Sequence, residues 1–272
     1  MSLSIASNTE SLMAARNLNR TQRGLSQSIS RLSSGLRINS AADDAAGLAI
    51  SEKMRSQVRS YGAALRNAMD GISMIQIAEG TLNEVAGLYG RMRELAVQGG
   101  SETLSSTDRS AINDEYTALQ AEANRLAENT EFNGINLLGS TASSLDIQVG
   151  IHSGAAYSVT VSMIDVTTLT PGGTITTAAS ALAAIGTIDS AIQSLSSGRA
   201  KIGASQNRLQ ASAGMLENAR ANMSAAESRI RDANVAEESA ALARNTILAQ
   251  AGAAALGQAN QIPALALALL GG

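Results

Sequence analysis

The sequence contains no cysteine, which excludes disulfides, thiolate metal sites and cysteine nucleophiles. It has no tryptophan, and its aromatic residues are four tyrosines and one phenylalanine. Aromatic side chains usually dominate the area buried in compact cores, whereas much of the 44% hydrophobic fraction here is alanine. Small side chains allow helices to pack closely along their length, so the composition favours an elongated helical protein.

Charge is also sparse and unevenly placed. The net charge is −3 and the basic residues are scattered, which argues against nucleic-acid binding. No charged residue follows Arg244, yet the continuous apolar run at 264–270 is far shorter than the ~20 residues of a membrane span, so we expect no membrane insertion. The opening "MSLSIASNTESLMAA" lacks a cationic start and an apolar core, so we expect no secretory signal peptide there.

The sequence offers no recognisable active site. His152 is the only histidine, no serine lies in a nucleophile-elbow motif, and the phosphate, dinucleotide and zinc motifs are absent. The adjacent acids Asp43 and Asp44 lack the spaced ligands of a calcium loop. Because they follow Asn39 and Ser40, they favour a helix start, where carboxylates oppose the helix dipole. We therefore expect no catalytic residue, no bound metal and no cofactor.

A heptad repeat runs through the first half of the chain. Reading in steps of seven gives a row that is apolar throughout: Met54, Tyr61, Ala68, Ile75, Leu82, Tyr89 and Ala96. A companion row four residues on is apolar at first and then breaks at Glu79 and Arg93. This spacing is typical of a helix that packs against another helix. It predicts one helix over about 46–97, on the order of 75 Å long at ~1.5 Å per residue.

The second half of the chain holds a stricter seam. Its large members are Ile188, Leu195, Ile202, Leu209, Leu216, Met223 and Ile230, and three residues after each stands alanine, glycine or serine. Because a large row lies beside a small one, another helix can approach closely along the whole length. The two seams together predict a long antiparallel, coiled-coil-like rod.

Shorter elements separate the two long helices. An amphipathic stripe is formed by Ile112, Tyr116, Leu119, Ala123 and Leu126, and it follows the cap residues of "SSTD" at 105–108. Asn133-Gly134 is a turn signal that ends the helical region. Two alternating runs, 145–151 and 157–163, predict a β-hairpin. The polar, Gly- and Thr-rich stretch at 165–184 predicts an exposed connection.

Apolar stripes without an evident core lie at both ends of the chain. The N-terminal stripe comprises Leu18, Leu25, Ile29, Leu32 and Leu36, and the C-terminal one comprises Ile247, Ala251, Ala254 and the leucines of "QIPALALALLGG" at 261–272. A helix gains most of its stability from tertiary packing. We therefore predict that the two stripes pair with each other, or pack on another molecule.

Six strings in the sequence resemble bacterial flagellin. They are "RLSSGLRINSAADDAAGLAI" (31–50), "NAMDGISMIQIAEGTLNEV" (67–85), "RMRELAVQ" (91–98), "TEFNGINLL" (130–138), "GASQNRLQ" (203–210) and "QANQIPALALALL" (258–270). They follow in order through both halves and cover about 1–140 and 185–272. The resemblance implies a non-enzymatic subunit that self-assembles into the helical filament used for swimming.

The resemblance also implies a domain organisation. Residues 1–40 with 236–272 would form a terminal core domain, whose paired helices line a hollow tube and become ordered on polymerisation. Residues 41–235 would form the rod domain, with a β-hairpin at about 140–165 and a variable connection at about 165–184 that is too short for large outer domains. Polymerisation and chaperone binding would involve the terminal side chains Leu18, Leu25, Ile29, Leu32, Leu256, Ile262, Leu265, Leu267, Leu269 and Leu270.

The partners implied by the resemblance begin with other copies of the chain, in a secreted, extracellular filament. Others are the flagellar cap and hook–filament junction proteins, and a cytosolic export chaperone that covers the uncharged C-terminal stretch before type III export as an unfolded chain. Toll-like receptor 5 would contact Arg91, Leu95 and Glu115. Tyr89-Gly90 precede this motif where receptor-active relatives usually carry Leu-Gln, and inter-subunit contact is the alternative role.

Three other functions compete with a filament subunit. A hook–filament junction protein resembles flagellin at both ends but forms only a short collar. A membrane-active helical protein would use the C-terminal tail on lipid. An enzyme is the weakest alternative, because residues 140–185 contain no zinc motif of the kind that protease-bearing relatives carry there.

Overall fold

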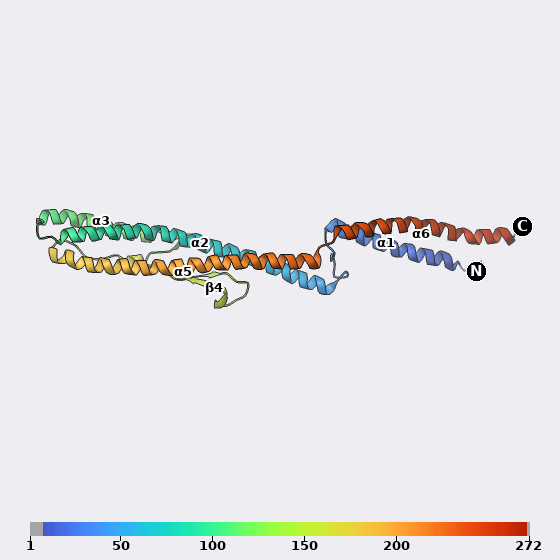
Figure 1. The fold of residues 1–272 in the computed structure, drawn as a ribbon, viewed down its shortest axis with the longest axis horizontal. Helices are drawn as coiled ribbons and strands as arrows, with labels where there is room; N and C mark the ends of the chain where they lie inside the picture. The colour runs from blue at the N-terminus through green and yellow to red at the C-terminus, as the bar shows by residue number, and fades with distance from the viewer. Residues whose placement is uncertain (1–7, 271–272) are drawn as a thin grey trace. The chain divides into compact units, whose positions relative to one another are not determined.

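The computed structural model describes the backbone of residues 8–270 and the side chains of residues 8–261. Six helices dominate the described chain: α1 (Thr9–Ser34), α2 (Ala45–Gly99), α3 (Ser106–Asn129), α4 (Val166–Leu169), α5 (Ala178–Arg231) and α6 (Val235–Leu270). The strands are β1 (Glu131–Phe132), β2 (Ile135–Asn136), β3 (Leu145–Gln148) and β4 (Ser158–Val161), with a 3-10 turn η1 (Ala155–Tyr157). The predicted mainly α fold with paired long helices is confirmed (Figure 1).

The chain divides into two compact units. One, which we call the rod unit, spans Gln57–Ala221; the other, the terminal unit, combines the chain up to Ser56 with the chain from Asn222 onward. Helices α2 and α5 each contribute to both units.

The rod unit has a continuous core along α2 and α5. Arg93 of α2 pairs with Asp189 of α5, and Gly71 contacts Leu209, so residue numbers run in opposite directions and the helices are antiparallel. The α5 seam residues Ile188, Leu195, Ile202, Leu209 and Leu216 are at most 1% exposed, as are Ala68, Ile75, Leu82, Tyr89 and Ala96 of α2. Tyr61 is half-buried, and Met54, Met223 and Ile230 are half-buried members of the terminal unit.

Helix α3 folds back beside α2 through a short capped connection. Ser105 and Asp108 form a reciprocal capping box, in which each side chain accepts a hydrogen bond from the other residue's backbone N–H. Arg109 then donates to the carbonyl oxygens of Gly99 and Ser101 at 2.8 and 2.7 Å. These bonds satisfy acceptors that the end of α2 would otherwise leave unpaired. The cap residues in "SSTD" therefore act as predicted.

Two small hairpins follow α3. Strands β1 and β2 pair around Asn133 (φ 51°) and Gly134 (φ 77°), the left-handed pair that a two-residue hairpin turn requires. The second hairpin is the one that the alternating runs predict, and it pairs Leu145 with Val161 and Ile147 with Val159. Its strands are shorter than the alternating runs predict, because the chain leaves the ladder after Gln148 and re-enters it through η1.

The stretch at 165–184 is less exposed than the sequence predicts. Val166 and Ile175 are fully buried, and α5 already begins at Ala178. Polar contacts fix the remainder: the hydroxyls of Tyr89 and Thr170 lie 3.1 Å apart, and the Ile175 N–H donates to Asn113 Oδ1 at 2.8 Å. Isolated apolar residues in a Gly- and Thr-rich stretch show no periodicity, so the sequence pattern gives no sign of this burial.

Candidate assembly surface

In the terminal unit, α1 and α6 lie side by side in opposite directions (Figure 1). At one end Asn8 Nδ2 donates to the Ala259 carbonyl at 2.8 Å and Ser11 Oγ donates to Asn260 Oδ1 at 2.6 Å. At the other end Arg31 and Glu238 form an ion pair at 2.8 Å, with side chains only 26% and 13% exposed. The two ends of the chain therefore pair, which is one of the two arrangements that the sequence predicts.

Local sequence signals fix the limits of α1. Asn8 caps its first turn by accepting from the Ser11 N–H. Gly35 ends the helix in the left-handed conformation, with φ 72°, and its N–H donates to the Arg31 carbonyl. Glycine adopts this conformation without the strain that a Cβ would bring.

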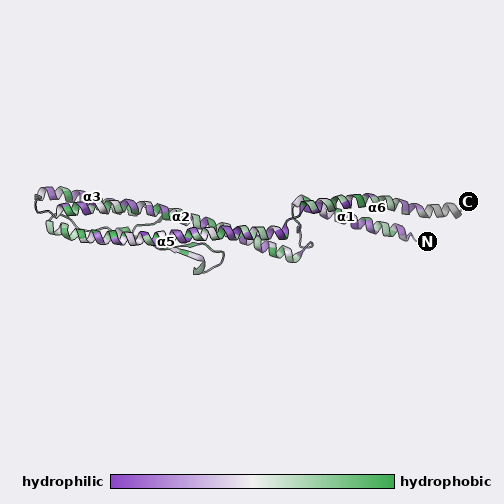
Figure 2. Cartoon of the chain, viewed as in Figure 1, coloured by the Kyte–Doolittle hydropathy of each residue, from purple (hydrophilic) through white to green (hydrophobic). Residues whose placement is uncertain are grey.

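Very few of the described side chains of the α1/α6 pair are buried, namely those of Ser28 and Ala259. Large apolar side chains stay half or more exposed: Leu12 64%, Met13 68%, Ile29 52%, Val235 62%, Ile247 66% and Leu248 49%. Figure 2 shows hydrophobic residues recurring along α6. Since these exposed apolar side chains lie on a helix pair with so few buried side chains of its own, the surface of the pair is a candidate for contact with other molecules.

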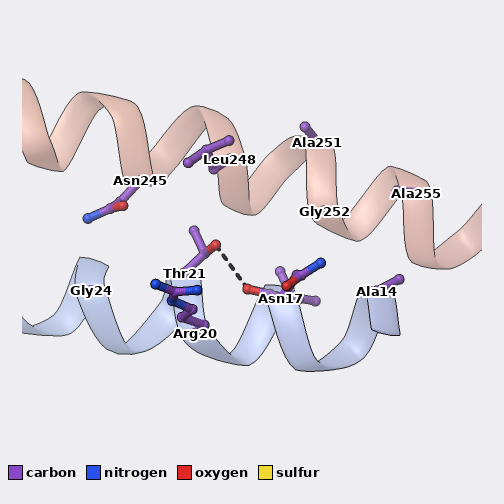
Figure 3. A pocket seen from close by; sticks show the side chains of 11 residues that line it. Ala14, Asn17, Arg20, Thr21, Gly24, Asn245, Leu248, Ala251, Gly252 and Ala255 are labelled. Carbon is purple, nitrogen blue, oxygen red and sulfur yellow. Dashed lines mark hydrogen bonds between the residues drawn. The ribbon is translucent and has the colours of Figure 1, made fainter. Parts of the chain in front are cut away.

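A furrow of about 810 Å³ runs between the two helices. Small residues stand where the helices face each other closely: a Cβ at Gly24 would lie 3.1 Å from Asn245 Nδ2, and one at Gly252 would lie 3.4 Å from Leu18 Cδ1. Figure 3 shows Gly24 opposite Asn245, with Leu248 and Thr21 farther along. Arg20 is the only charged residue of the lining, which also includes the amide side chains of Asn17 and Asn245.

The predicted terminal side chains lie at different depths in this pair. Leu18, Leu25, Leu32 and Leu256 are half-buried, and Ile29 is exposed. The backbone of α6 continues to Leu270. The other predicted side chains lie outside the described residues; they are those of Ile262, Leu265, Leu267, Leu269 and Leu270.

A polar joint that the heptad pattern did not indicate connects the helices of the terminal unit. Arg37 donates to the Ile230 carbonyl from Nε and Nη2, at 3.2 and 2.6 Å, and Leu36 forms an antiparallel bridge with Asp232. Arg231 pairs with Glu52 at 2.6 Å. The motif "SSGLRIN" supplies the first strand of this joint, but nothing in its local spacing identifies the partner 193 residues away.

Asp43 and Asp44 both serve the start of α2. Asp44 Oδ1 accepts from the Gly47 N–H at 2.8 Å, which caps the helix. Asp43 Oδ2 accepts from the Ser40 N–H and hydroxyl and from the Asn39 N–H, and these hydrogen bonds, those from Ser40 first, lower the pKa of the Asp43 carboxyl. The structure therefore supports the helix-start interpretation over a metal site.

On the rod unit, the predicted receptor surface is only partly assembled. Arg91 pairs with Glu115 of α3 at 2.8 Å and with Glu94 at 3.0 Å, and all three are exposed. Leu95 is 1% exposed and belongs to the core, because it faces the seam side of α2. Leu95 is therefore corrected from a surface residue to a core residue, while Arg91 and Glu115 remain an exposed pair.

Comparison with known proteins now identifies the fold. Residues 5–143 match the bacterial flagellin N-terminal helical region, and residues 185–270 match the bacterial flagellin C-terminal helical region. A flagellin of Halalkalibacterium halodurans is 46% identical over 257 residues, with 93% of each chain covered. The chain belongs to the bacterial flagellin family. A flagellin of Bacillus subtilis is 40% identical over 297 residues, covering 95% of this chain and 98% of its own. The crystal structure of Bacillus cereus flagellin aligns with a TM-score of 0.51 and 30% identity, over 55% of this chain and 88% of that one.

Flagellins are structural proteins that polymerise with copies of themselves into the extracellular flagellar filament. The chain is thus a structural subunit of a filament and not an enzyme, and its flagellin relatives disfavour the hook–filament junction alternative. The two matched regions leave only 144–184 between them, a stretch that holds β3, β4 and α4 and no large outer domain.

The described part of this flagellin contains no cluster of three or more histidine or acidic side chains that could hold a metal ion. His152 lies against Tyr157, with ring centroids 5.2 Å apart and an edge-on geometry. Within the described helices, none is both long and apolar enough to cross a bilayer.

Proposed function

We propose that this flagellin builds its filament through the α1/α6 pair, whose uncovered apolar side chains become the innermost contacts between subunits. The observation that carries this proposal is that, among the described side chains of α1 and α6, only Ser28 and Ala259 are buried. Fully burying a leucine, isoleucine or methionine side chain contributes about 1.5–3 kcal/mol. Each copy added to a growing end can therefore gain free energy that the isolated pair leaves unused.

Residues 1–40 with 236–272 accordingly form the wall of the tube in this proposal, and they become ordered on polymerisation. Fixing a residue's backbone costs about 1–2 kcal/mol, and the described side chains of the pair bury too little to offset that cost. Ordering is then coupled to assembly. Residues 41–235 act as a preformed rod, since the seam from Ile188 to Leu216 is already buried inside one copy.

The cap, the hook–filament junction proteins and the export chaperone follow from the same surface. The cap and the hook–filament junction proteins would meet the apolar faces of α1 and α6 at the two ends of the filament. An export chaperone would cover α6 beyond Arg244, where no charged side chain opposes an apolar partner, before secretion through type III export. Toll-like receptor 5 would read the exposed Arg91–Glu115 pair, without a contribution from the buried Leu95.

Removing residues 258–272 tests the proposal. The truncated chain should keep the helical signal and melting transition of the rod unit, measured by circular dichroism, but should not elongate filament seeds. The matched control is Met215→Ser, which replaces an apolar side chain that is 63% exposed on the rod unit and should still elongate. Filaments of normal length and diameter from the truncated chain would refute the role of the α1/α6 pair.

A further inference from the structure

We propose that the furrow between α1 and α6 receives the first turns of α1 from a second copy of the chain, so that Glu10 of that copy meets Arg20. The inference rests on the proposed function and names the segment that docks on the assembly surface. Two observations point to it: an arginine in the furrow without a partner among the described residues, and an acidic, apolar start of α1 whose Leu12 and Met13 side chains are exposed.

The furrow combines a cation with small and apolar walls. Leu18, Leu248, Ala251 and Ala255 supply apolar surface, while Arg20 lies at the α1 edge (Figure 3). The Arg20 side chain makes no hydrogen bond or ion pair within residues 8–261. Exposed to water, the guanidinium is well solvated. A helix laid over the furrow removes that water, and a buried charge without a partner is strongly unfavourable. Any occupant of the furrow must therefore bring an acceptor, preferably a carboxylate that matches the arginine fork.

Few carboxylates are available on the terminal helices. Glu238 is already paired with Arg31, which leaves Glu10 and Glu237, both exposed. Glu10 is followed within one turn by Leu12 and Met13, the most exposed large apolar side chains of α1, at 64% and 68%. The start of α1 thus offers a carboxylate beside two apolar side chains, which complements a cation beside an apolar furrow.

This contact cannot form within one copy. The hydrogen bonds of Asn8 and Ser11 hold the start of α1 beside Ala259 and Asn260. Arg20 lies ten residues farther along the same helix, about 15 Å away at ~1.5 Å per residue. A projection and a complementary hollow at different places on one molecule allow a head-to-tail contact, which leaves one of each free at its two ends and extends into a fibre when its rotation does not close a ring. Docking of Glu10 on Arg20 is therefore compatible with the open polymer of the proposed function.

Charge exchange in the full-length chain tests the pairing. Arg20→Glu and Glu10→Arg should each raise the critical concentration for seeded elongation by about tenfold, the factor that corresponds to about 1.4 kcal/mol. The chain that carries both substitutions should return to within about threefold of wild type, because the pair is restored with its signs exchanged. Arg23→Glu is the matched control: it makes the same charge change on an exposed position of α1 outside the furrow, and it should shift the critical concentration much less.

The outcomes separate this inference from the proposed function. Wild-type assembly by both single variants, alongside failure of the chain lacking 258–272, would overturn the docking of Glu10 on Arg20 and leave the assembly role of α6 intact. Rescue of Arg20→Glu by Glu237→Arg instead of Glu10→Arg would also overturn it, because the start of α6 would then be the occupant. Assembly by the truncated chain would count against the proposed function itself.

Introduced cysteines give a second measurement, since the natural chain has none. Met13→Cys with Leu248→Cys should form disulfides between copies in oxidised filaments, visible as a ladder on non-reducing gels. Within one copy these positions are about 12 Å apart along the pair, beyond the ~7 Å limit between the Cα atoms of a disulfide. The control chain carries Met13→Cys with Ile247→Cys, because Ile247 lies outside the furrow. Equal ladders from the two pairs, or none from the first, would overturn the proposal.

Discussion

Gly198 allows a close approach in the rod unit, and replacing it with alanine should lower stability although alanine is the better helix former. A Cβ at position 198 would overlap Ile164 Cδ1 and stand 2.5 Å from its Cγ1. Alanine gains about 1 kcal/mol of helix propensity over glycine, whereas overpacking typically costs about 1–3 kcal/mol. We therefore expect Gly198→Ala to lower the free energy of unfolding by about 0–2 kcal/mol.

The sign of the effect is the decisive observation. Gly214 lies on the same helix with open space around it, so Gly214→Ala should stabilise the rod unit by about 0.5–1 kcal/mol. In the Ile164→Ala background the obstacle is gone, and Gly198→Ala should become stabilising by about 1 kcal/mol. Urea unfolding followed by circular dichroism gives the free energy of unfolding of these two glycine variants, of Ile164→Ala, of the double variant and of the natural chain. If Gly198→Ala stabilises the otherwise natural chain as much as Gly214→Ala does, the packing argument is wrong.

Three other perturbations test the rod and the terminal unit. Leu209→Ala removes a fully buried seam side chain and should lower the free energy of unfolding, measured by chemical denaturation, by about 3–5 kcal/mol. The control Met215→Ala, at a 63% exposed position, should change it by less than about 0.5 kcal/mol. Equal losses of stability in the two variants would contradict the register of the seam. The hydrogen bonds from Ser40 lower the pKa of the Asp43 carboxyl. The stabilisation of the 39–43 turn is therefore present above the ordinary aspartate pKa and is lost as pH falls through the pKa of the folded state. Amide hydrogen exchange at Ser40 should become faster over that fall in pH, and Asp43→Asn should remove this pH dependence. Burial raises the pKa of the Tyr89 phenol, so rod stability should be intact below the unfolded tyrosine pKa and fall as pH rises through the folded value. Tyr89→Phe should weaken that loss of stability without abolishing it, because the pKa of Tyr116 is also raised by burial. At neutral pH the same substitution should lower the free energy of unfolding by about 0.5–1.5 kcal/mol, because the contact with Thr170 is lost.

Periodic features of the rod could be predicted from the sequence. The heptad row from Ile188 extends over five fully buried positions inside the rod unit, and the predicted helix at about 46–97 corresponds to α2 at Ala45–Gly99. Both rest on many repeats of one spacing, so a single irregular residue such as Glu79 does not obscure them. The turn at Asn133-Gly134 was predicted too, but the small β1–β2 ladder around it was not, because two residues per strand carry no alternation.

Contacts between segments distant in sequence could not be predicted in this way. The small row beside the α5 seam suggested close approach of a helix, whereas at Gly198 the neighbour is Ile164, from the segment after β4. Leu95 belongs to a motif that the family resemblance placed on the surface, yet its position on α2 puts it in the core. For the assembly surface, the sequence indicated which residues lack a core, but the furrow depends on how Gly24 and Gly252 meet the opposite helix.

The pairing of α1 with α6 also fixes an order of events in time. Asn8 and Ala259 are 251 residues apart in sequence, and Ser11 and Asn260 are 249 apart. Contacts at such separation close a very long loop, and they form later than local contacts. A chain that appears N-terminus first must carry α1 without its partner until nearly every other residue has emerged. The surface used to join other copies is thus completed last, after the rod unit has had the opportunity to fold.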